Sequence, residues 1–415
     1  MSDLRMTPAK NALASGIVFL AALILLLASG RDRGGYRIDE AHKVADTHFF
    51  HLVRSGDLTH PDWFRHIADR TNPPVGKFLF GLSAWLHGAA IPEDLSMRVE
   101  EPDGTLGQRL RGEEDDFDDV LRASRRVSIL ATAATAAVVF SIAAFAGGLP
   151  AGILGALLHL AHYLTLTFAG TAVYDPLLTL FVALSALPLI HLDRVPTRRR
   201  LILSAVAAGL FAAAAFQTRL SGLLGLLVLV LMFLVAWIVT RRRDFGTFIA
   251  VAIPVFAVAA IAVNPFYWSA SRTATEPPGA PLPGRIIERF TLQLRELSEL
   301  LRRQSENQEV LSTVGAKAAF AAEIVLGDLI GMLMLLGWGL AAFFLVRAPG
   351  RGLRNAIVLA WSGLIIALLV LWLPLAWPRY LLVAIPAAAA GAAVGWWQLL
   401  SSIGTAVRSK TSASS

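Results

Sequence analysis

Long apolar runs alternate with short polar segments along most of this chain. A helix rises about 1.5 Å per residue, so a span of the hydrocarbon layer needs about 20 mainly apolar residues. The pattern predicts an all-α polytopic membrane protein with about ten transmembrane helices. The candidate spans lie near residues 11–29, 127–146, 150–170, 176–192, 201–217, 222–240, 246–264, 325–346, 355–373 and 380–399.

An eleventh apolar run, "VGKFLFGLSAWLHGAAI" at 75–91, is short and contains Lys77 and His87. Short cytoplasmic loops collect Lys and Arg, and this rule decides how the run is interpreted. With ten spans, both termini and the basic segments 191–200, 240–244 and 346–354 all fall on the cytoplasmic side. We therefore interpret 75–91 as a juxtamembrane or re-entrant helix.

This topology leaves two large external segments, 30–124 and 265–317. The first is expected to carry juxtamembrane helices. In the second, apolar residues recur every three or four positions and predict an amphipathic helix, which lies either on the outer leaflet or against the protein's own loops. Those residues are Ile287, Phe290, Leu294, Leu297 and Leu301.

The first apolar run admits a second interpretation. Arg5 and Lys10 precede an apolar core that ends in "LLASG", a pattern also typical of a signal peptide. Nine spans would then remain, and the chain would lose its N-terminal anchor.

Composition narrows the function classes. Hydrophobic residues make up 55% of the 415 positions, charged residues 16%, and the mean hydropathy is +0.60. The chain has no cysteine, which excludes disulfides, thiolate metal sites and a cysteine nucleophile. The formal net charge of +7 falls largely in the patches that set topology, so no nucleic-acid partner is predicted.

A few charged residues stand at the outward ends of the predicted spans. Asp39 and Glu40 follow the first span, while Asp175, Arg219 and Arg379 stand in outer connections that are otherwise almost free of charge. Each alone could be a side chain that reaches the head groups. Together on one face, they suit a reaction in which a base activates a hydroxyl while cations hold a phosphate leaving group.

Two further motifs fit this chemistry. In "NPPVGKFLFG" the Pro pair disfavours helix at Asn72, and Lys77 enters the first helical turn. Lys77 could neutralise a lipid-linked phosphate or serve only as a topological anchor. In "RASRRVS" (122–128), Arg125 and Arg126 open a span from outside, so at least one of them is expected to have an acidic partner.

Metal sites are less well supported by the sequence. The run "EEDDFDDV" (113–120) lacks the spacing of a calcium loop and is interpreted as solvated. Five histidines, at 42, 48, 51, 60 and 66, cluster in the first external segment. His48 and His51 could share a helical face, but with no defined third ligand we do not predict a zinc site. No Walker or dinucleotide-binding loop is present.

In their order along the chain, these motifs resemble those of the C-type (GT-C) membrane glycosyltransferases. The most similar branches are the protein O-mannosyltransferases and the aminoarabinose transferases of lipid A. The series runs from the acidic pair Asp39-Glu40 through "NPPVGK", "RRVS", "YDPLL" and "TRLSGLL" to "PRYLL". Asn72 departs from the usual His before the Pro pair, and 265–317 is too short for the large luminal domain of the eukaryotic mannosyltransferases.

The resemblance implies an inverting hexosyl- or pentosyltransferase that uses a polyprenyl-phosphate sugar and acts on the outer or periplasmic side. It implies that Asp39 is the general base with Glu40 beside it and Asp175 as a second catalytic acid. Lys77, Arg125 and Arg379 would contact the donor phosphate, and Arg219 and Asn72 occupy further substrate-binding positions. No cofactor is certain; if a divalent cation binds, Asp39 and Asp175 are its candidate ligands.

The same resemblance suggests a bacterial inner-membrane protein whose acceptor is a lipid, a polysaccharide or a protein, with membrane lipids around it. Residues 1–264 would form the catalytic transmembrane module, 265–317 the second external segment, and 318–415 the C-terminal helices and cytoplasmic tail. A transporter or lipid flippase is the alternative, with Glu323 and Asp328 as its deeper charges. A structural partner is the third class.

Overall fold

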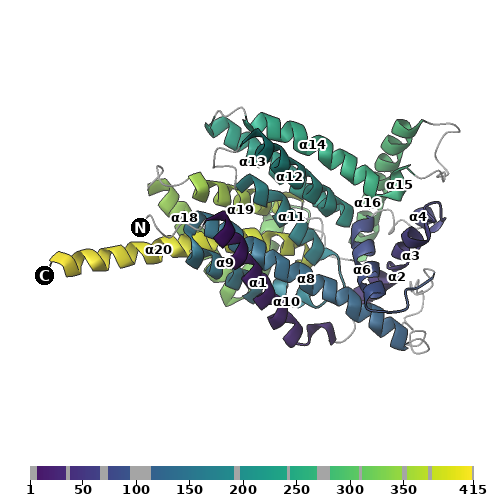
Figure 1. Ribbon diagram of the computed structural model, residues 1–415, viewed down its shortest axis with the longest axis horizontal. Helices are drawn as coiled ribbons and strands as arrows, with labels where there is room; N and C mark the ends of the chain where they lie inside the picture. The colour runs from purple at the N-terminus through teal and green to yellow at the C-terminus, as the bar shows by residue number, and fades with distance from the viewer. Residues whose placement is uncertain are drawn as a thin grey trace.

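The computed structural model describes ten stretches of the chain, and all their regular structure is helical (Figure 1). These stretches are 7–33, 38–65, 73–93, 114–190, 197–240, 244–268, 281–307, 311–347, 353–372 and 376–413. No strand occurs within them. The all-α prediction is confirmed.

Each of the ten predicted spans coincides with a helix or a bent helix pair. By length and composition, seven described helices could cross a membrane, or eight if α9 and α10, bent by 65° at their junction, form one span. α11 and α13 are shorter apolar helices, so the count of ten is not confirmed. The helices are α1 (Pro8–Ala28), α8 (Glu114–Gly147), α9 (Leu149–Ala161), α10 (Tyr163–Ala169), α11 (Asp175–Ile190), α12 (Arg198–Thr218), α13 (Leu223–Thr240), α14 (Asp244–Val263), α18 (Leu329–Arg347), α19 (Leu353–Trp372) and α20 (Ile385–Ala413).

The remaining short elements lie mostly between the spans. They are η2 (Arg31–Arg33), α2 (Ile38–Ala45), α3 (His48–Ser55), α4 (Asp62–Arg65), α6 (Pro74–Leu86), η5 (Leu220–Gly222), α15 (Pro265–Trp268), α16 (Leu282–Asn307), α17 (Val314–Leu326) and η7 (Pro378–Ala384). In Figure 1, α2, α3, α4, α6, α15 and α16 gather at one end of the helix array. α1 begins and α20 ends at the opposite end.

Helix α8 connects the short helices at one end of the array with the long helices. Its first turns carry Phe117, Val120 and Leu121, which are buried in a cluster with α2 and with Phe80 of α6. Its later turns pack against α1, α9 and α20. Residues 114–120 of the acidic run, predicted to be a solvated loop, are instead the first turns of α8, so that prediction is wrong. α6 confirms the predicted helix within 75–91, and it packs against α3, α8 and α12.

Helix α16 confirms the predicted helix in 265–317. Of the predicted apolar stripe, Phe290 and Leu297 pack against a buried cluster on α12 and α14, whereas Ile287 and Leu294 are exposed. The packed face also contains Arg289 and Gln293, which are fully buried. The Arg289 guanidinium donates to the carbonyl of Phe266 at 2.5 Å, and the Tyr267 hydroxyl donates to Gln293 at 2.5 Å, so hydrogen bonds to α15 compensate the desolvation of these polar groups.

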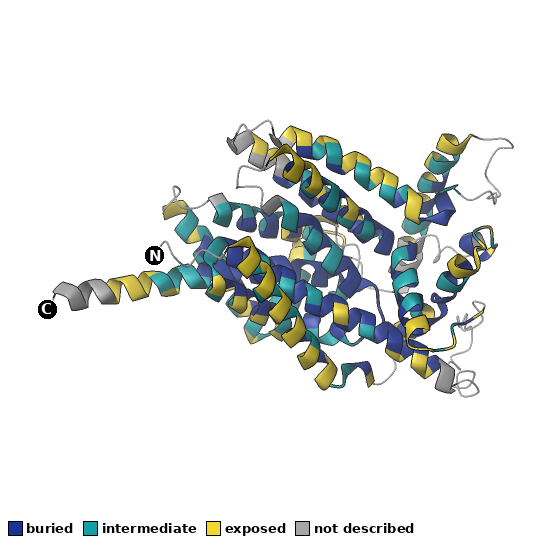
Figure 2. Cartoon of the chain, in the orientation of Figure 1, coloured by how far each residue is buried: buried dark blue, intermediate teal, exposed yellow. Residues whose placement is uncertain are grey.

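The core depends on close helix packing through small residues. The first half of α20, "IPAAAAGAAVG", is buried between α18, α9 and α8, and residues 402–407 are exposed (Figure 2). Without a strong hydrophobic driving force between helices in lipid, small residues allow the backbones to approach closely. A Cβ on Gly395 would lie 1.9 Å from the carbonyl oxygen of Gly337 on α18.

The outer surface suits a lipid environment. On α1, Ala22 and Leu26 are buried against α8, while Leu13, Ile17 and Ile24 are more than half exposed. Figure 2 shows the exposed residues of α1, α13 and α14 on the outside of the array. Exposed apolar faces on long apolar helices identify an integral membrane protein.

Replacing Gly395 with Ala should destabilise the protein by about 1–3 kcal/mol, because the added methyl forces α20 away from α18. Gly339 on α18 is the matched control, since a Cβ there meets nothing within 4 Å. Gly339→Ala should leave stability unchanged or slightly raised. Thermal unfolding of both variants in detergent tests this, and equal melting temperatures would contradict the packing.

Candidate active site

The acidic pair divides between two environments at the start of α2. Asp39 and Glu40 are consecutive in the first helical turn, so their side chains point in different directions. Glu40 has no exposed surface, whereas the side chain of Asp39 is 59% exposed. Only Asp39 is open to a bound molecule in this structure.

Glu40 is held by Arg125 of α8. Arg125 Nε donates to Glu40 Oε1 at 2.8 Å and Nη2 to Oε2 at 2.7 Å, which makes a bidentate pair. The backbone N–H of Ala172, shortly before α11, donates to the same Oε1 at 2.6 Å. The side chain of Arg125 is 3% exposed. This buried pair fastens α2 to α8 and to the segment that leads into α11.

The neighbouring guanidinium also has an acidic partner. Arg126 Nε lies 3.6 Å from an Asp32 carboxylate oxygen, and Arg125 Nη1 donates to the Asp32 carbonyl at 3.4 Å. The prediction that Arg125 or Arg126 has an acidic partner is confirmed. These partners come from α2 and η2.

Asp39 is held by a residue from the far end of the chain. Arg379, in η7, donates from Nη1 to Asp39 Oδ2 at 2.7 Å. Its guanidinium carbon lies 4.2 Å from the centroid of the Trp377 ring, within cation–π range. Its Nε is buried and has no hydrogen-bond partner among the described residues. Arg379 therefore keeps donor capacity beyond its contact with Asp39.

A second acid–guanidinium pair adjoins the first. Arg219, between α12 and η5, donates to Asp175, the first residue of α11. The Arg219 guanidinium carbon lies 5.1 Å from the centroid of the Tyr380 ring, next to Arg379. Arg219 also interacts electrostatically with Asp39. The structure thus brings Asp39, Asp175, Arg219 and Arg379 into one cluster, as the motif order predicted.

Lys77 lies in α6 and is 2% exposed. Its ammonium is 3.9 Å from the centroid of the Phe49 ring. α6 approaches the segment before α11 closely, because a Cβ on Gly76 would lie 2.4 Å from the Tyr174 ring. The Tyr174 hydroxyl donates to Asp46 at 2.7 Å. Asn72, the other predicted residue of this motif, lies outside the described residues.

Sequence reasoning missed the aromatic members of the site. Tyr174 directly precedes Asp175, and Trp377 and Tyr380 flank Arg379. The sequence did offer a signal for them, because "VYDPLL" and "WPRYLL" place aromatic residues next to isolated charges. Aromatic rings orient guanidinium groups in apolar surroundings.

The comparisons with known proteins agree with the fold and the motifs. A family model described as dolichyl-phosphate-mannose-protein mannosyltransferase matches residues 64–270. Among solved structures, ArnT from Cupriavidus metallidurans bound to undecaprenyl phosphate is 16% identical, with a TM-score of 0.55 over 98% of this chain and 64% of that one. These matches confirm the resemblance to the GT-C membrane glycosyltransferases that the motifs indicated.

The same ArnT in the apo state gives a TM-score of 0.58 at 16% identity, over 92% of this chain and 60% of that one. The chain therefore spans about three fifths of the length of these structures. A search of curated proteins finds no match.

Removing one partner of the Glu40–Arg125 pair should destabilise the fold strongly. Arg125→Met leaves a buried carboxylate without its counter-charge, at a cost of about 3–5 kcal/mol. Arg122, on the same helix, pairs with Asp119 at the surface, where both side chains are about half exposed. Arg122→Met should cost less than about 1 kcal/mol. Thermal unfolding compares the two variants, and equal losses would contradict the role given to the buried pair.

Proposed function

We propose that this GT-C chain moves a sugar from a polyprenyl-phosphate donor to an acceptor hydroxyl, with Asp39 as the general base. The observation that carries the proposal is the exposed Asp39 carboxylate held by Arg379 beside the Asp175–Arg219 pair. The matching family is named for dolichyl-phosphate-mannose, and the similar ArnT structure is bound to undecaprenyl phosphate, which supports the donor class.

The proposed step is a single displacement with inversion at the anomeric carbon. The acceptor oxygen forms a bond to that carbon while its proton passes to an Asp39 carboxylate oxygen. The bond between the anomeric carbon and the phosphate oxygen breaks, and polyprenyl phosphate leaves with the electron pair. A general base of this kind typically contributes about 10²- to 10⁴-fold in rate.

Charge on the leaving phosphate would be stabilised by the fixed cations nearby. Arg379 has a buried Nε donor without a partner among the described residues, so it could bind phosphate while still contacting Asp39. In a low-dielectric setting a fixed guanidinium stabilises developing charge more strongly than water does. Lys77 is a second proposed contact, and it would have to turn away from the Phe49 ring to reach the donor.

Glu40 and Arg125 have a positioning role in this proposal. Each satisfies the other's charge within the protein, and Glu40 is fully buried. Their pairing sets the direction of the first turn of α2 and thereby the place of Asp39. This replaces direct catalysis by Glu40 and direct phosphate contact by Arg125 as the proposed roles of these residues.

The step as proposed uses no metal ion. Asp39 and Asp175, the two carboxylates that could ligate a divalent cation, each engage a guanidinium group. A cation bound between them would face Arg379 and Arg219 at close range, and like charges repel strongly in apolar surroundings. The residues present therefore suit an arginine-based site.

The proposed orientation follows from the gathering of α2, α3, α4, α6 and α16 at one end of the helices (Figure 1). That end faces the periplasm of a bacterial inner membrane, and the N- and C-termini are cytoplasmic. The donor arrives within the lipid plane, and the acceptor, a lipid, a polysaccharide or a protein, approaches Asp39 from water. Arg219 and Asp175 form the adjoining wall.

A transporter has less support in the described residues. Asp328, one of the two deeper charges, accepts the Gly331 N–H at 2.6 Å and the Tyr163 N–H at 3.3 Å. It satisfies backbone groups at the starts of α18 and α10, which is a structural task. Glu323, the other, is exposed on α17.

Asp39→Asn should lower sugar transfer by about 10²- to 10⁴-fold, because an amide does not accept the acceptor proton. The measurement is release of polyprenyl phosphate from a panel of polyprenyl-phosphate sugars in detergent. Stability should be preserved, since the Asp39 side chain is more than half exposed. Asp57→Asn, at an exposed position in the same external segment, is the control with unchanged transfer. Near-normal transfer by Asp39→Asn would refute the proposal.

Arg379→Met should reduce kcat/KM for the donor by about 10²- to 10³-fold, a loss typical of removing one preorganised donor to a developing anion. Arg379→Lys should recover part of that loss, because it restores the charge but not the planar fork. Steady-state kinetics with varied donor test this. If Arg379→Met and Arg379→Lys behave alike, charge at this position is not what the reaction requires.

A further inference from the structure

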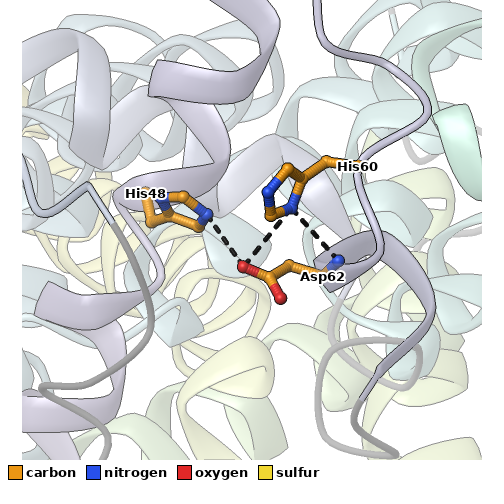
Figure 3. Close-up of side chains that lie close together, drawn as sticks. All are labelled: His48, His60 and Asp62. Carbon is orange, nitrogen blue, oxygen red and sulfur yellow. Dashed lines mark hydrogen bonds and ion pairs between the residues drawn. The ribbon is translucent and has the colours of Figure 1, made fainter.

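Three polar side chains of the first external segment, none of them used in the proposed active site, converge on one another (Figure 3). His48 begins α3, Asp62 begins α4, and His60 lies two residues before Asp62. His48 Nε2 is 3.0 Å and His60 Nδ1 is 3.4 Å from the same Asp62 carboxylate oxygen. The three ligand atoms all lie within 4.8 Å of one another.

Neighbouring donors and acceptors limit the states of both imidazoles. His48 Nδ1 lies 3.3 Å from the Pro92 carbonyl oxygen and Nε2 lies 3.0 Å from an Asp62 carboxylate oxygen; both oxygens only accept, so a neutral ring donates to one of them. The Asp62 backbone N–H donates to His60 Nδ1 at 3.3 Å, a long hydrogen bond that a metal ion on this nitrogen would replace. With the His48 hydrogen on Nδ1, its Nε2 presents a lone pair to the Asp62 carboxylate oxygen.

In that tautomer, a positive charge between the three groups would stabilise the arrangement. A proton on His48 Nε2 could supply it, but the imidazole is 1% exposed and a buried imidazolium loses its hydration. A metal ion shared by all three groups satisfies the lone pairs without charging the ring.

We propose that His48, His60 and Asp62 form a zinc site that the sequence alone did not reveal. Two imidazole nitrogens and one carboxylate oxygen match the ligands that zinc takes, and they leave a fourth position for water. Ligands about 2.0–2.1 Å from a tetrahedral zinc lie about 3.3 Å from one another. The distances of 3.0 and 3.4 Å to the Asp62 oxygen are close to this value.

The site would have a structural consequence for the external elements. It ties the start of α3 to the start of α4, across which the rings of Phe49 and Trp63 pack at a centroid distance of 4.9 Å. Phe49 is also the ring under the Lys77 ammonium. Zinc would therefore stabilise the packing of Phe49 against Trp63 and, through Phe49, the position of Lys77.

The test is zinc binding by the full-length protein, purified in detergent without a histidine tag and stripped with chelator. Zinc is titrated in competition with a chromophoric chelator. We expect one bound zinc in the unaltered protein. His60→Ala should weaken zinc affinity at least about tenfold. Losing a residue that only orients a metal ligand already costs about 10- to 100-fold, and His60 would be a ligand itself.

The matched control is His51→Ala. His51 stacks on His48 at a centroid distance of 6.4 Å but lies outside the three-residue group. This variant should retain zinc binding. Zinc should raise the melting temperature of the unaltered protein and of His51→Ala, but not of His60→Ala. The His60 side chain is partly exposed, so His60→Ala should still fold.

Two results would overturn the proposal. The first is no zinc bound by the unaltered protein, which would assign the central charge to a proton on His48. The second is equal binding by the unaltered protein and His60→Ala, which would place the zinc elsewhere. Magnesium serves as a further control, because nitrogen ligands select zinc over magnesium. Equal stabilisation by both ions would also contradict the site.

Discussion

The buried ion pair between Glu40 and Arg125 is the interaction on which the arrangement of the site depends. A carboxylate with no exposed surface is costly unless its charge and lone pairs are satisfied. Here two guanidinium N–H groups and one backbone N–H meet it, from α8 and from the segment before α11. A rotated or shifted α2 would lose all three bonds, so this pair fixes where Asp39 emerges.

A second constraint acts through the C-terminal helices. Arg379 reaches Asp39 from η7, directly before α20, whose small residues allow close contact with α8, α9 and α18. The external elements and the C-terminal helices are therefore joined to the same helix, α8. This explains how residues 340 positions apart in sequence meet at 2.7 Å.

Sequence patterns predicted the helices and the charged members of the site, because apolar run length and isolated charges at span ends are local signals. They did not separate Asp39 from Glu40, since burial of one and exposure of the other depends on where α2 meets α8. The same limit applies to α16, where partners on α15 bury Arg289 and Gln293. The group of His48, His60 and Asp62 was hidden because the sequence suggested His51 as the partner of His48, whereas the chain turns between α3 and α4 to bring in the other two.

We propose that the end of the bundle bearing Asp39 and Arg379 receives the phosphate of a polyprenyl-phosphate sugar. An experimental structure of the protein with undecaprenyl phosphate is the decisive test. The phosphate should lie within hydrogen-bonding distance of Arg379 and beside Asp39, with the lipid chain running into the membrane along the helices. A phosphate bound at the opposite end, near the starts of α12 and α14, would contradict it.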